Sequence, residues 1–440
     1  MPRIARTPQA QPNMLDRPVE IEMTTPPAAF RPSVLLSHPT GNQNVRNALR
    51  SLVEHEMLAE FWTSIQWNAE SGWNRLLPPG VKAQLARRSF PEASAGQVKT
   101  LPWREIVRLG ARSTPLEPIL SAQGRPFSSF GMYRHFDRRV ARRLAELRPN
   151  AVYTYETAAR QSFRQAKRCG ITTIYEKDSS YWKWANRLFA EEAERNPHLA
   201  GLLCSLDDSR AHLEWKEEEL QLADHIVVPS EHVRHSLRGV VAEEKILVLG
   251  FGAPGIRPRT KFNVDASRPL KVLFVGHLGQ HKGIGYLLDA MDMLGSQAEL
   301  TLVGGRLRPN ARVDEACRRW RWHGTMPHNQ VLDLMQESDV LVLPSLSDAF
   351  GLVVTEALAC GLPVIVTPNT GASEMIRDGR EGFIVPVCRA DAIAARLETL
   401  HRNREMLVEM SLRAQRTAAE MSWENYRDRW AGAVRSLAWR

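Results

Sequence analysis

Residues 271–294 read KVLFVGHLGQHKGIGYLLDAMDML and contain one complete unit of the fold. The first five residues form a short apolar run, which is typical of a strand buried on both faces of a parallel sheet. Residues 276–285 are a glycine-containing loop, and residues 286–294 have the apolar spacing of a helix. A strand followed by such a loop and a helix is the repeating unit of an open α/β sheet.

The same unit recurs along the chain. Other apolar runs that end in glycine, proline or polar residues lie at 33–37, 151–155, 171–175, 226–230, 300–303, 340–343 and 364–366. Because helical patterns separate these runs, we expect parallel strands with helices on both faces of each sheet. Ligands of such sheets bind beyond the carboxyl ends of the strands. The predicted fold class is therefore α/β, with two Rossmann-like domains facing across a cleft.

One stretch interrupts the alternation and marks a domain boundary. Residues 250–269, GFGAPGIRPRTKFNVDASRP, are rich in glycine, proline and polar residues and lack periodicity, as linkers do. We therefore predict a first domain over residues 31–255 and a second domain over residues 256–415.

Both ends of the chain differ from these domains. Residues 1–30 are rich in proline, threonine and glutamine without periodicity and are predicted to be a mobile leader. Residues 416–440 have the pattern of an amphipathic helix. We expect its aromatic stripe to be core, and the stripe consists of Trp423, Tyr426 and Trp430.

The composition disfavours several classes of protein. The chain has 440 residues, of which 43% are hydrophobic and 24% charged, as in globular proteins. No run of about 18 apolar residues occurs and the first residues lack an apolar signal segment, so neither a transmembrane helix nor secretion is predicted. The five cysteines are widely spaced without a CxxC or Cys/His cluster, which disfavours disulfides and a zinc site. We therefore expect a cytoplasmic protein.

The charge balance is basic, with 58 Lys and Arg against 49 Asp and Glu. This favours an anionic partner such as phosphates, an acidic membrane surface or nucleic acid. Residues 134–149, RHFDRRVARRLAELRP, place arginines between apolar residues at helical spacing. A solvated helix face is the favoured interpretation, and peripheral contact with an anionic membrane or an anionic substrate is the alternative. Nucleic acid is not expected, because the arginine clusters lack interleaved aromatic residues.

The strongest motif is residues 344–386, PSLSDAFGLVVTEALACGLPVIVTPNTGASEMIRDGREGFIVP. Asp348 lies in a predicted loop, Gly351 opens a predicted helix, and Glu356 falls on its first turns. The free amides at a helix start favour an anion such as a phosphate. A carboxylate beside that start, Glu356, suits a ribose diol, since each hydroxyl can donate to it. The alternative for each acid is a charge that only stabilises the helix dipole.

This segment resembles the nucleotide-sugar signature of family 4 glycosyltransferases, the retaining enzymes of GT-B fold. The signature has an acidic residue, seven further residues and then Glu, as in Asp348 and Glu356. Later positions match in order, at Ala357, Gly361, Pro363, Gly371, Glu374, Gly379, Gly382 and Pro386. The resemblance covers roughly residues 270–430 well, and the first domain only in outline.

The resemblance implies specific roles for these residues. Glu356 would hold the nucleotide ribose, and Asp348 would contact hydroxyls of the donor sugar. Asp348 stands where the family usually has Glu, so its carboxylate is retracted by roughly 1.5 Å. The diphosphate would meet the backbone at Phe350, Gly351, Leu352 and Val353.

A second loop carries the expected cation. Gly276–His277–Leu278–Gly279–Gln280–His281–Lys282–Gly283 follows a strand, where a cation can stabilise a diphosphate leaving group. The family commonly has an arginine and a lysine here. Lys282 matches the lysine, whereas the arginine is absent and only His277 and His281 could substitute. Neutral histidine is a weaker anion clamp than a guanidinium.

Three further loops are candidates by position. Gly41 and Asn42 precede the first helix and could face the donor phosphates, or form an ordinary turn. Near Gly304, Thr325 and Met326 the family uses backbone to hold the base, and a packing glycine is the alternative. On the acceptor side, Tyr153, Glu156, Lys177 and Asp178 lie at strand ends, and either acid could position a hydroxyl.

Together these features predict a retaining, hexosyltransferase-type glycosyltransferase of GT-B fold. It would move a sugar from a nucleoside-diphosphate sugar, such as a UDP-sugar, to a saccharide or lipid-linked saccharide in polysaccharide or cell-envelope glycan synthesis. The second domain would bind the donor and the first the acceptor, and the last helix would cross back to the first domain. The catalytic candidates are Asp348, Glu356 and Lys282, with no metal and no cofactor. The alternatives are a nucleotide-sugar 2-epimerase or a sugar phosphorylase of the same fold, and a non-catalytic nucleotide-sugar binder.

Overall fold

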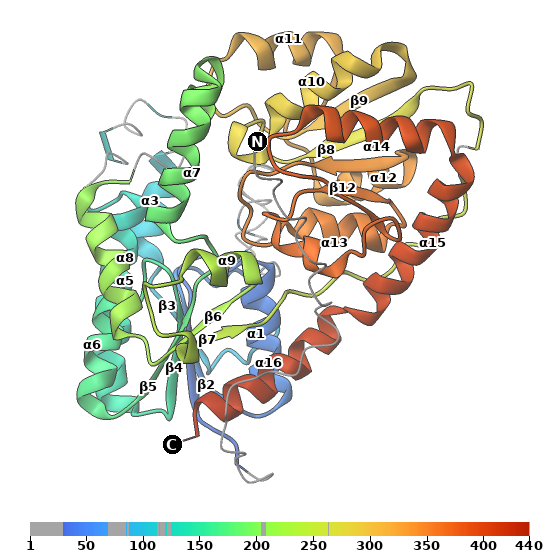
Figure 1. Ribbon diagram of the computed structural model, residues 1–440. Coiled ribbons are helices and arrows are strands. Elements are labelled where there is room, and N and C mark those ends of the chain that lie inside the picture. The colour runs from blue at the N-terminus through green and yellow to red at the C-terminus, as the bar shows by residue number, and fades with distance from the viewer. Residues whose placement is uncertain are drawn as a thin grey trace, which may run out of the picture. The chain divides into compact units, whose positions relative to one another are not determined.

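The computed structural model divides into two compact units (Figure 1). Among the described residues, the second unit consists of Ala253–Glu420 and His198–Leu202, and the first unit contains the rest, including the segment after Glu420. The structure describes residues 30–68, 85, 88–111, 114, 119–120, 125–203, 208–262 and 264–439. The predicted leader lies, except for Phe30, outside the described residues.

One segment belongs to a different unit from the one predicted. The short 3₁₀ turn Pro197–Leu202 falls within the predicted first domain, but His198–Leu202 group with the second unit. The amide of Asn310 donates to the carbonyl of His198 at 2.8 Å, and Leu199 packs directly over Gly285. These long-range contacts hold the turn against the second unit, and the local sequence does not predict them.

The second unit contains a six-stranded parallel sheet with the order β10-β9-β8-β11-β12-β13. The strand order reverses between β8 and β11, and ligands of open α/β sheets bind at the carboxyl end of such a reversal. The strands are β8 (Leu270–Val275), β9 (Ala298–Val303), β10 (Arg321–Trp322), β11 (Val340–Leu343), β12 (Val364–Val366) and β13 (Gly382–Ile384). The helices are α10 (Ile284–Leu294), α11 (Ala311–Arg319), α12 (His328–Glu337), α13 (Leu352–Ala359), α14 (Ala390–Arg402) and α15 (Arg404–Glu420).

The core of the second unit follows from its apolar strands. Every residue of β11 is buried, as expected for a central strand with helices on both faces. Helix α10 packs against α14, and α13 packs against α15. This packing fixes the two loops at the strand-order reversal, which carry the candidate residues.

The first unit contains a seven-stranded parallel sheet with the order β3-β2-β1-β4-β5-β6-β7. Its order reverses between β1 and β4. The strands are β1 (Val34–Ser37), β2 (Leu58–Thr63), β3 (Val98–Thr100), β4 (Ala151–Tyr155), β5 (Thr172–Glu176), β6 (His225–Val228) and β7 (Ile246–Val248). The helices include α1 (Gln43–Glu54), α3 (Pro102–Ala111), α5 (Ser129–Leu147), α6 (Arg160–Cys169), α7 (Trp182–Arg195), α8 (Arg210–Leu222), α9 (Glu231–Ser236) and α16 (Trp423–Leu437).

The last helix, α16, belongs to the first unit and packs against α1. Ser51 donates to the carbonyl of Arg427 at 2.7 Å, and the Trp430 indole donates to the Tyr153 hydroxyl at 3.2 Å. The aromatic residues predicted as core, Trp423, Tyr426 and Trp430, are all buried.

Hydrogen bonds and an ion pair hold part of the predicted linker against the second unit. Arg259 is buried and donates to the carbonyls of Ser338 and Gly361. Arg257 pairs with Asp333 at 2.8 Å, and its amide donates to the carbonyl of Ala359. Composition alone could not reveal this anchoring, because it depends on two arginines among glycines and prolines.

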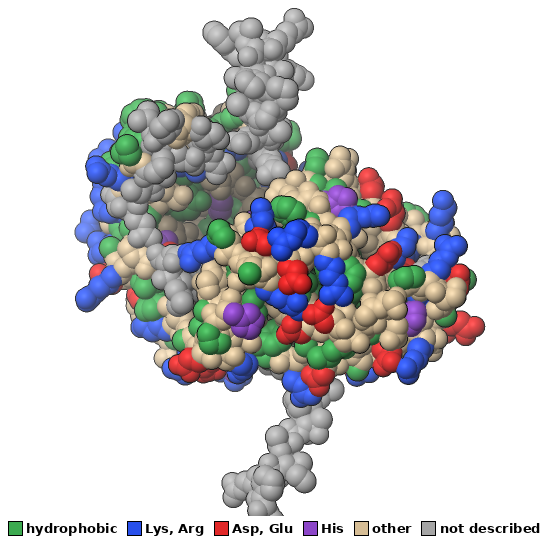
Figure 2. All heavy atoms as spheres, turned by 90° about the horizontal axis from the view of Figure 1, so that it is seen from above, with side chains coloured by type: hydrophobic (Ala, Val, Ile, Leu, Met, Phe, Trp, Pro, Cys, Tyr) green, Lys and Arg blue, Asp and Glu red, His purple; other side chains and the backbone are tan. Residues whose placement is uncertain are grey.

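None of the described helices is long and apolar enough to span a membrane. The described residues also contain no group of three or more side chains placed to bind a metal ion. Figure 2 shows basic and acidic side chains mingled on the face it presents, without one large patch of a single sign.

Candidate functional site

The loops after β8 and β11 meet at the carboxyl edge of the second sheet. The amide of Leu346 donates to the carbonyl of His281 at 3.0 Å. At Gly283, which has a φ of 73°, a Cβ atom would lie 2.0 Å from the carbonyl oxygen of Pro344. Only glycine fits such an approach in this conformation. The strand-order reversal therefore brings together two loops that lie about sixty residues apart.

Lys282 and Asp348, one from each loop, form an ion pair. Their side chains are 22% and 13% exposed, so both remain within reach of a small molecule. The sequence predicts that both residues bind a nucleotide sugar, but it does not predict their contact with each other. Each charge balances the other in this structure.

The loop that carries Asp348 is held on both sides. Its amide donates to the carbonyl of Asn369 at 2.9 Å, and its carbonyl accepts from the amide of Gly371 at 3.0 Å. The Asn369 side chain in turn donates to the carbonyl of Leu346 at 2.7 Å. Asp348 therefore has a fixed backbone position. Sequence analysis did not single out Asn369, whose signal is only its place after β12.

Helix α13 starts without a side-chain cap. Gly351 occupies the cap position with a φ of 82°, and no side chain bonds there. Among the described residues, no hydrogen-bond partner is recorded for the amides of Leu352 and Val353. Unsatisfied amides and the positive end of the helix dipole favour an anion. The buried ring of Phe350 lies just before this start.

Glu356 lies one turn after Leu352, so both residues share one face of α13. Its side chain is 13% exposed, and burial raises the pKa of its carboxyl group to about 7. The nearest charged group recorded is His328, whose Nδ1 lies 3.8 Å from Glu356 Oε1. His328 starts α12 and was not a predicted site residue. Glu356 is thus a carboxylate without hydrogen-bond donors of its own among the described side chains.

The glycines after β8 and β9 allow close contact between their loops. A Cβ at Gly304 would lie 1.9 Å from the carbonyl oxygen of Gly276, so this position needs glycine for packing alone. The Trp322 indole donates to the Gly304 carbonyl at 2.9 Å. Beside them, the exposed residues His277 and Thr325 both border Gly305, and Met326 is half-buried. The structure therefore gathers the predicted base-binding residues at one place.

His281 cannot replace the missing arginine as a cation. Burial, reinforced by the charge of Lys282, lowers the pKa of its imidazole to about 4. Its ring also has a hydrogen bond with the backbone of Leu202. His281 is therefore neutral at physiological pH, and Lys282 carries the positive charge of this loop.

In the first unit, Gly41 and Asn42 have local roles. The Asn42 side chain accepts from the amide of Val45 at 3.0 Å and caps α1. The amide of Gly41 donates to Nδ1 of His38 at 2.6 Å, and Phe90 lies where a side chain would extend from Gly41. Both residues lie at the carboxyl end of β1, and their contribution to donor binding stays a prediction.

The candidate residues for acceptor binding differ in whether their side chains already have partners within the protein. Glu156 accepts from Lys177 at 2.9 Å and from Ser179 at 2.6 Å. Tyr153 is fully buried and donates to Glu176 at 2.6 Å, so it is a core residue. Asp178 is half-buried and has no ion pair recorded among the described residues.

The position of Asp178 also affects its ionisation. Burial, together with the nearby charge of Glu156, raises the pKa of its carboxyl group to about 6. Asp178 is therefore the acidic side chain at this edge that remains available for a ligand.

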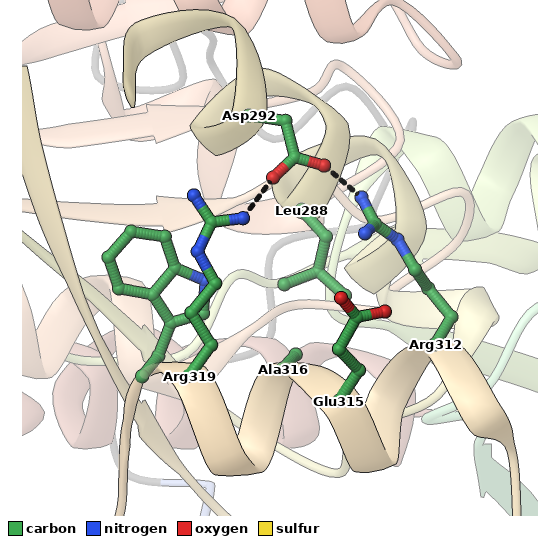
Figure 3. A pocket seen from close by; sticks show the side chains of 7 residues that line it. Leu288, Asp292, Arg312, Glu315, Ala316 and Arg319 are labelled. Atoms are coloured by element: carbon green, nitrogen blue, oxygen red, sulfur yellow. Dashed lines mark hydrogen bonds and ion pairs between the residues drawn. The ribbon is translucent and has the colours of Figure 1, made fainter. Parts of the chain in front are cut away.

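A small pocket lies elsewhere in the second unit, between α10 and α11 (Figure 3). Asp292 bonds both Arg312 and Arg319 across it, and Leu288 and Glu315 line its walls. Because the arginines are neutralised by the protein itself, this pocket offers no anion site. It shares no residue with the loops described above.

Comparison with known proteins bears directly on the second unit. Residues 257–417 match the family model described as Glycosyl transferases group 1. This segment is therefore similar to group 1 glycosyltransferases. The matched range contains Lys282, Asp348 and Glu356, so the ion pair and the uncapped helix lie in the family's part of the chain.

Curated relatives are also glycosyltransferases. A D-inositol 3-phosphate glycosyltransferase of Rhodococcus jostii is 32% identical over 192 residues, which are 40% of this chain and 42% of that protein. The amylovoran biosynthesis glycosyltransferase AmsK of Erwinia amylovora is 32% identical, over 39% of this chain and 48% of that protein. The matches therefore span less than half the length of these two relatives.

Solved structures extend the similarity to both units. HepE of Anabaena, solved with UDP and glucose, has a TM-score of 0.61 at 15% identity and covers 92% of this chain and 99% of that chain. Sucrose-phosphate synthase of Thermosynechococcus elongatus has a TM-score of 0.62 at 17% identity and covers 92% and 99%. The segment that matches the family model is thus part of a GT-B fold with two Rossmann-like units.

Proposed function

We propose that this chain is a retaining glycosyltransferase that moves a hexosyl group from a nucleoside-diphosphate sugar to a hydroxyl acceptor. One observation carries the proposal most directly. An uncapped helix start, a carboxylate without donors and the Lys282–Asp348 pair lie in adjoining loops of the segment that matches group 1 glycosyltransferases. Such a set matches an anion, a diol and a sugar respectively.

The donor would bind along this edge of the second unit. Its diphosphate would accept from the amides of Leu352 and Val353, and its ribose hydroxyls would donate to Glu356. The base would lie by Gly304, Thr325 and Met326. HepE of Anabaena was solved with UDP-glucose, and this supports a uridine nucleotide as the first donor to test.

Lys282 would change partners when the donor binds. Its ammonium group now contacts Asp348, and a diphosphate would compete for it. Release from Lys282 would leave Asp348 as an acceptor for sugar hydroxyls. This exchange would couple recognition of the sugar to recognition of the diphosphate.

The chemistry would then rest on charge stabilisation and positioning. The bond between the anomeric carbon and the diphosphate oxygen breaks, and its electron pair stays on the diphosphate. Lys282 and the amides of α13 stabilise that charge. The acceptor oxygen attacks from the same face, and its proton passes to the departing diphosphate. Because protein groups would supply the positive charge, we propose that no metal is needed.

The acceptor would bind the first unit, where Asp178 would position its hydroxyl. Curated relatives include an N-acetylgalactosaminyltransferase of Campylobacter jejuni named for a diphospho-undecaprenol-linked acceptor, and AmsK is named for amylovoran biosynthesis. These names support a saccharide or lipid-linked saccharide acceptor in polysaccharide or cell-envelope glycan synthesis.

A thermal-shift panel of nucleoside diphosphates and their sugars tests the proposal. A donor that binds the folded chain raises its melting temperature by mass action. We expect one base to stabilise the wild type, and Glu356→Ala to lose that shift. No shift with any nucleotide would overturn the proposal. Incubation of the stabilising sugar nucleotide without acceptor then separates a transferase from a 2-epimerase, which alone would form a new nucleotide sugar.

A further inference from the structure

Helix α3 of the first unit exposes large apolar side chains. Trp103 is 60% exposed and Ile106 is 57% exposed, and residues three positions apart lie on the same face of a helix. The ring of Phe127 packs edge-on against Trp103 at 5.8 Å between centroids. Exposed tryptophan and isoleucine side by side are unusual on a protein surface that contacts only water.

The opposite face of α3 is anchored in the protein. Glu105 is fully buried and forms ion pairs with Arg88 and Arg108. A buried carboxylate held by two guanidinium groups fixes the rotation of the helix about its axis. Trp103 and Ile106 therefore point outward because of the fold, and a simple rotation of α3 cannot bury them.

Arginines gather beside this helix. Burial lowers the pKa of His135 on α5, and the positive charges of Arg104, Arg139, Arg138 and Arg142 lower it further. Each of these four arginines therefore lies near His135. The Arg104 side chain also donates to the carbonyl of Pro126, just before α5, at 3.3 Å.

Three of these arginines have no ion-pair partner within the part of the chain that the structure describes. Arg138, Arg139 and Arg142 are exposed and occupy one stripe of α5. None of them has an ion pair recorded among the described residues. By contrast, the neighbouring Arg143 bonds both Glu60 and Glu146. The stripe thus keeps like charges together without a carboxylate partner among the described residues, and an external anion would relieve their repulsion.

We infer that α3 and the arginine stripe of α5 form a docking surface for an anionic lipid bilayer. Trp103 and Ile106 would enter the boundary between headgroups and acyl chains, as apolar residues of surface-binding helices do. Arg104, Arg138, Arg139 and Arg142 would contact the acidic headgroups. All of these residues lie in the first unit, so the inference stands independently of the proposed nucleotide site.

Charge and polarity together favour a bilayer over other anionic partners. Nucleic acid would be contacted by aromatic rings interleaved with the arginines for base stacking, but the stripe between Arg138 and Arg142 carries Val140 and Ala141. An acidic protein would supply carboxylates for the arginines, but Trp103 would need a separate apolar pocket on that protein. A bilayer offers both an anionic layer and an apolar layer at the required depth.

Co-sedimentation with lipid vesicles tests this surface without any nucleotide. We expect the full chain to sediment with vesicles that contain phosphatidylglycerol, and weakly with vesicles of phosphatidylcholine alone. The double variant Trp103→Ser, Ile106→Ser should bind anionic vesicles about tenfold less. The triple variant Arg138→Gln, Arg139→Gln, Arg142→Gln should lose about fivefold for each arginine.

Matched control variants distinguish vesicle binding by this surface from non-specific binding and from the effects of misfolding. Met293→Ser with Leu412→Ser removes two other exposed apolar residues. Arg210→Gln, Arg402→Gln and Arg413→Gln remove the same charge from arginines that have carboxylate partners. Both controls should bind vesicles as the wild type does, and every variant should keep the wild-type melting temperature within a few degrees.

Three results would overturn the inference. The first is a wild type that fails to sediment with anionic vesicles. The second is equal loss of binding in the control variants. The third is RNA that displaces the chain from vesicles at concentrations well below those of lipid. Failure of nucleotide binding would leave the vesicle result unaffected, so the two proposals fail separately.

Discussion

Helices α6 and α13 occupy equivalent places in their own units, but the hydrogen bonds at their N-terminal ends differ. Each follows the strand next to the strand-order reversal, β4 for α6 and β11 for α13. At α6, Glu219 accepts from the amides of Thr157, Ala159 and Arg160. Asp137 accepts from the two amides that follow. At α13, no side chain caps the start.

The comparison shows how one fold makes two kinds of helix start. We call the start of α6, where side chains accept from the amides, the closed edge, and the uncapped start of α13 the open edge. In the first unit, the hydrogen-bond acceptors at the helix start are supplied by the chain itself. In the second unit, the start of α13 keeps its capacity for an external anion, and the carboxylate of Glu356 beside it has no donor recorded among the described residues. The same physical feature therefore contributes to stability in one unit, and in the other unit we propose that it binds the diphosphate of the donor.

The largest expected effect lies at the closed edge. Glu219→Ala would leave three backbone amides, the Tyr175 hydroxyl and the Trp215 indole without their acceptor. We expect the free energy of unfolding to fall by about 3–5 kcal/mol, since each buried unsatisfied donor costs about 1–3 kcal/mol. Urea unfolding measures the loss. Unchanged stability would show that the two edges do not differ in this way.

The next effect lies at the open edge. Glu356→Ala should weaken binding of the preferred nucleoside diphosphate by about 2–4 kcal/mol, because two hydroxyl donors lose their carboxylate. Isothermal titration calorimetry measures this change. Affinity for inorganic pyrophosphate, which lacks ribose, serves as the control and should not change. An equal loss for both ligands would contradict the ribose assignment.

Lys282→Ala should reduce turnover more than donor affinity. The charge on the diphosphate increases as the glycosidic bond breaks, so Lys282 contributes most in the transition state. We expect kcat to fall by about 10²-fold, against a smaller change in the dissociation constant of the donor. Steady-state kinetics with direct binding separates the two quantities. Equal kcat and equal affinity would exclude Lys282 from the reaction.

The pH dependence of donor binding follows from Glu356. Its carboxyl group has a pKa of about 7 because of burial, and hydroxyl donors favour the ionised form. Below pH 7 a proton must leave before the ribose binds, so affinity should fall by up to about tenfold per pH unit. Glu356→Gln should bind weakly with a flatter profile.

The same shift predicts the opposite trend for stability. The folded-state pKa of Glu356 lies above its ordinary value, so its contribution to stability is present at low pH and lost as pH rises through 7. Glu356→Gln should therefore gain stability over the wild type at pH 8 and not at pH 4. A wild type that becomes more stable relative to the variant as pH rises would contradict the burial of an unsatisfied carboxyl.

The smallest effect concerns the acceptor. Asp178→Asn should raise the KM for acceptor by about fivefold, equivalent to about 1 kcal/mol, and leave donor affinity unchanged. Glu156→Gln is the comparison, because Glu156 already has Lys177 and Ser179 as partners. A change in donor affinity in Asp178→Asn would remove it from the acceptor site.

Local sequence was sufficient for the elements with long apolar runs. Strands β8 and β11 and the helix that carries Glu356 follow from patterns that lie within about ten residues of each other. Short strands were missed, because β2 mixes polar and apolar residues without regular alternation and β3, β7 and β13 have only three residues each. Such runs do not separate from loops by periodicity alone.

For the candidate site too, the sequence predicts the types of residue but not their contacts or burial. The types of residue at Lys282, Asp348 and Glu356 indicate charge and hydrogen bonding, and their motif places them in loops or on a helix. Their pairing depends on a contact across 66 residues, and the neighbour His328 comes from a separate helix. Burial is also non-local, and it is burial that raises the pKa of Glu356 and lowers the pKa of His281.

The most direct test uses the nucleoside diphosphate that stabilises the chain best and its 2′,3′-dideoxyribose analogue. Calorimetric titration of both ligands into the wild type and Glu356→Ala completes a double-mutant cycle. We predict that the wild type binds the analogue at least tenfold more weakly, whereas Glu356→Ala binds both ligands alike. A wild type that does not distinguish the two ligands would contradict the binding of ribose at the open start of α13.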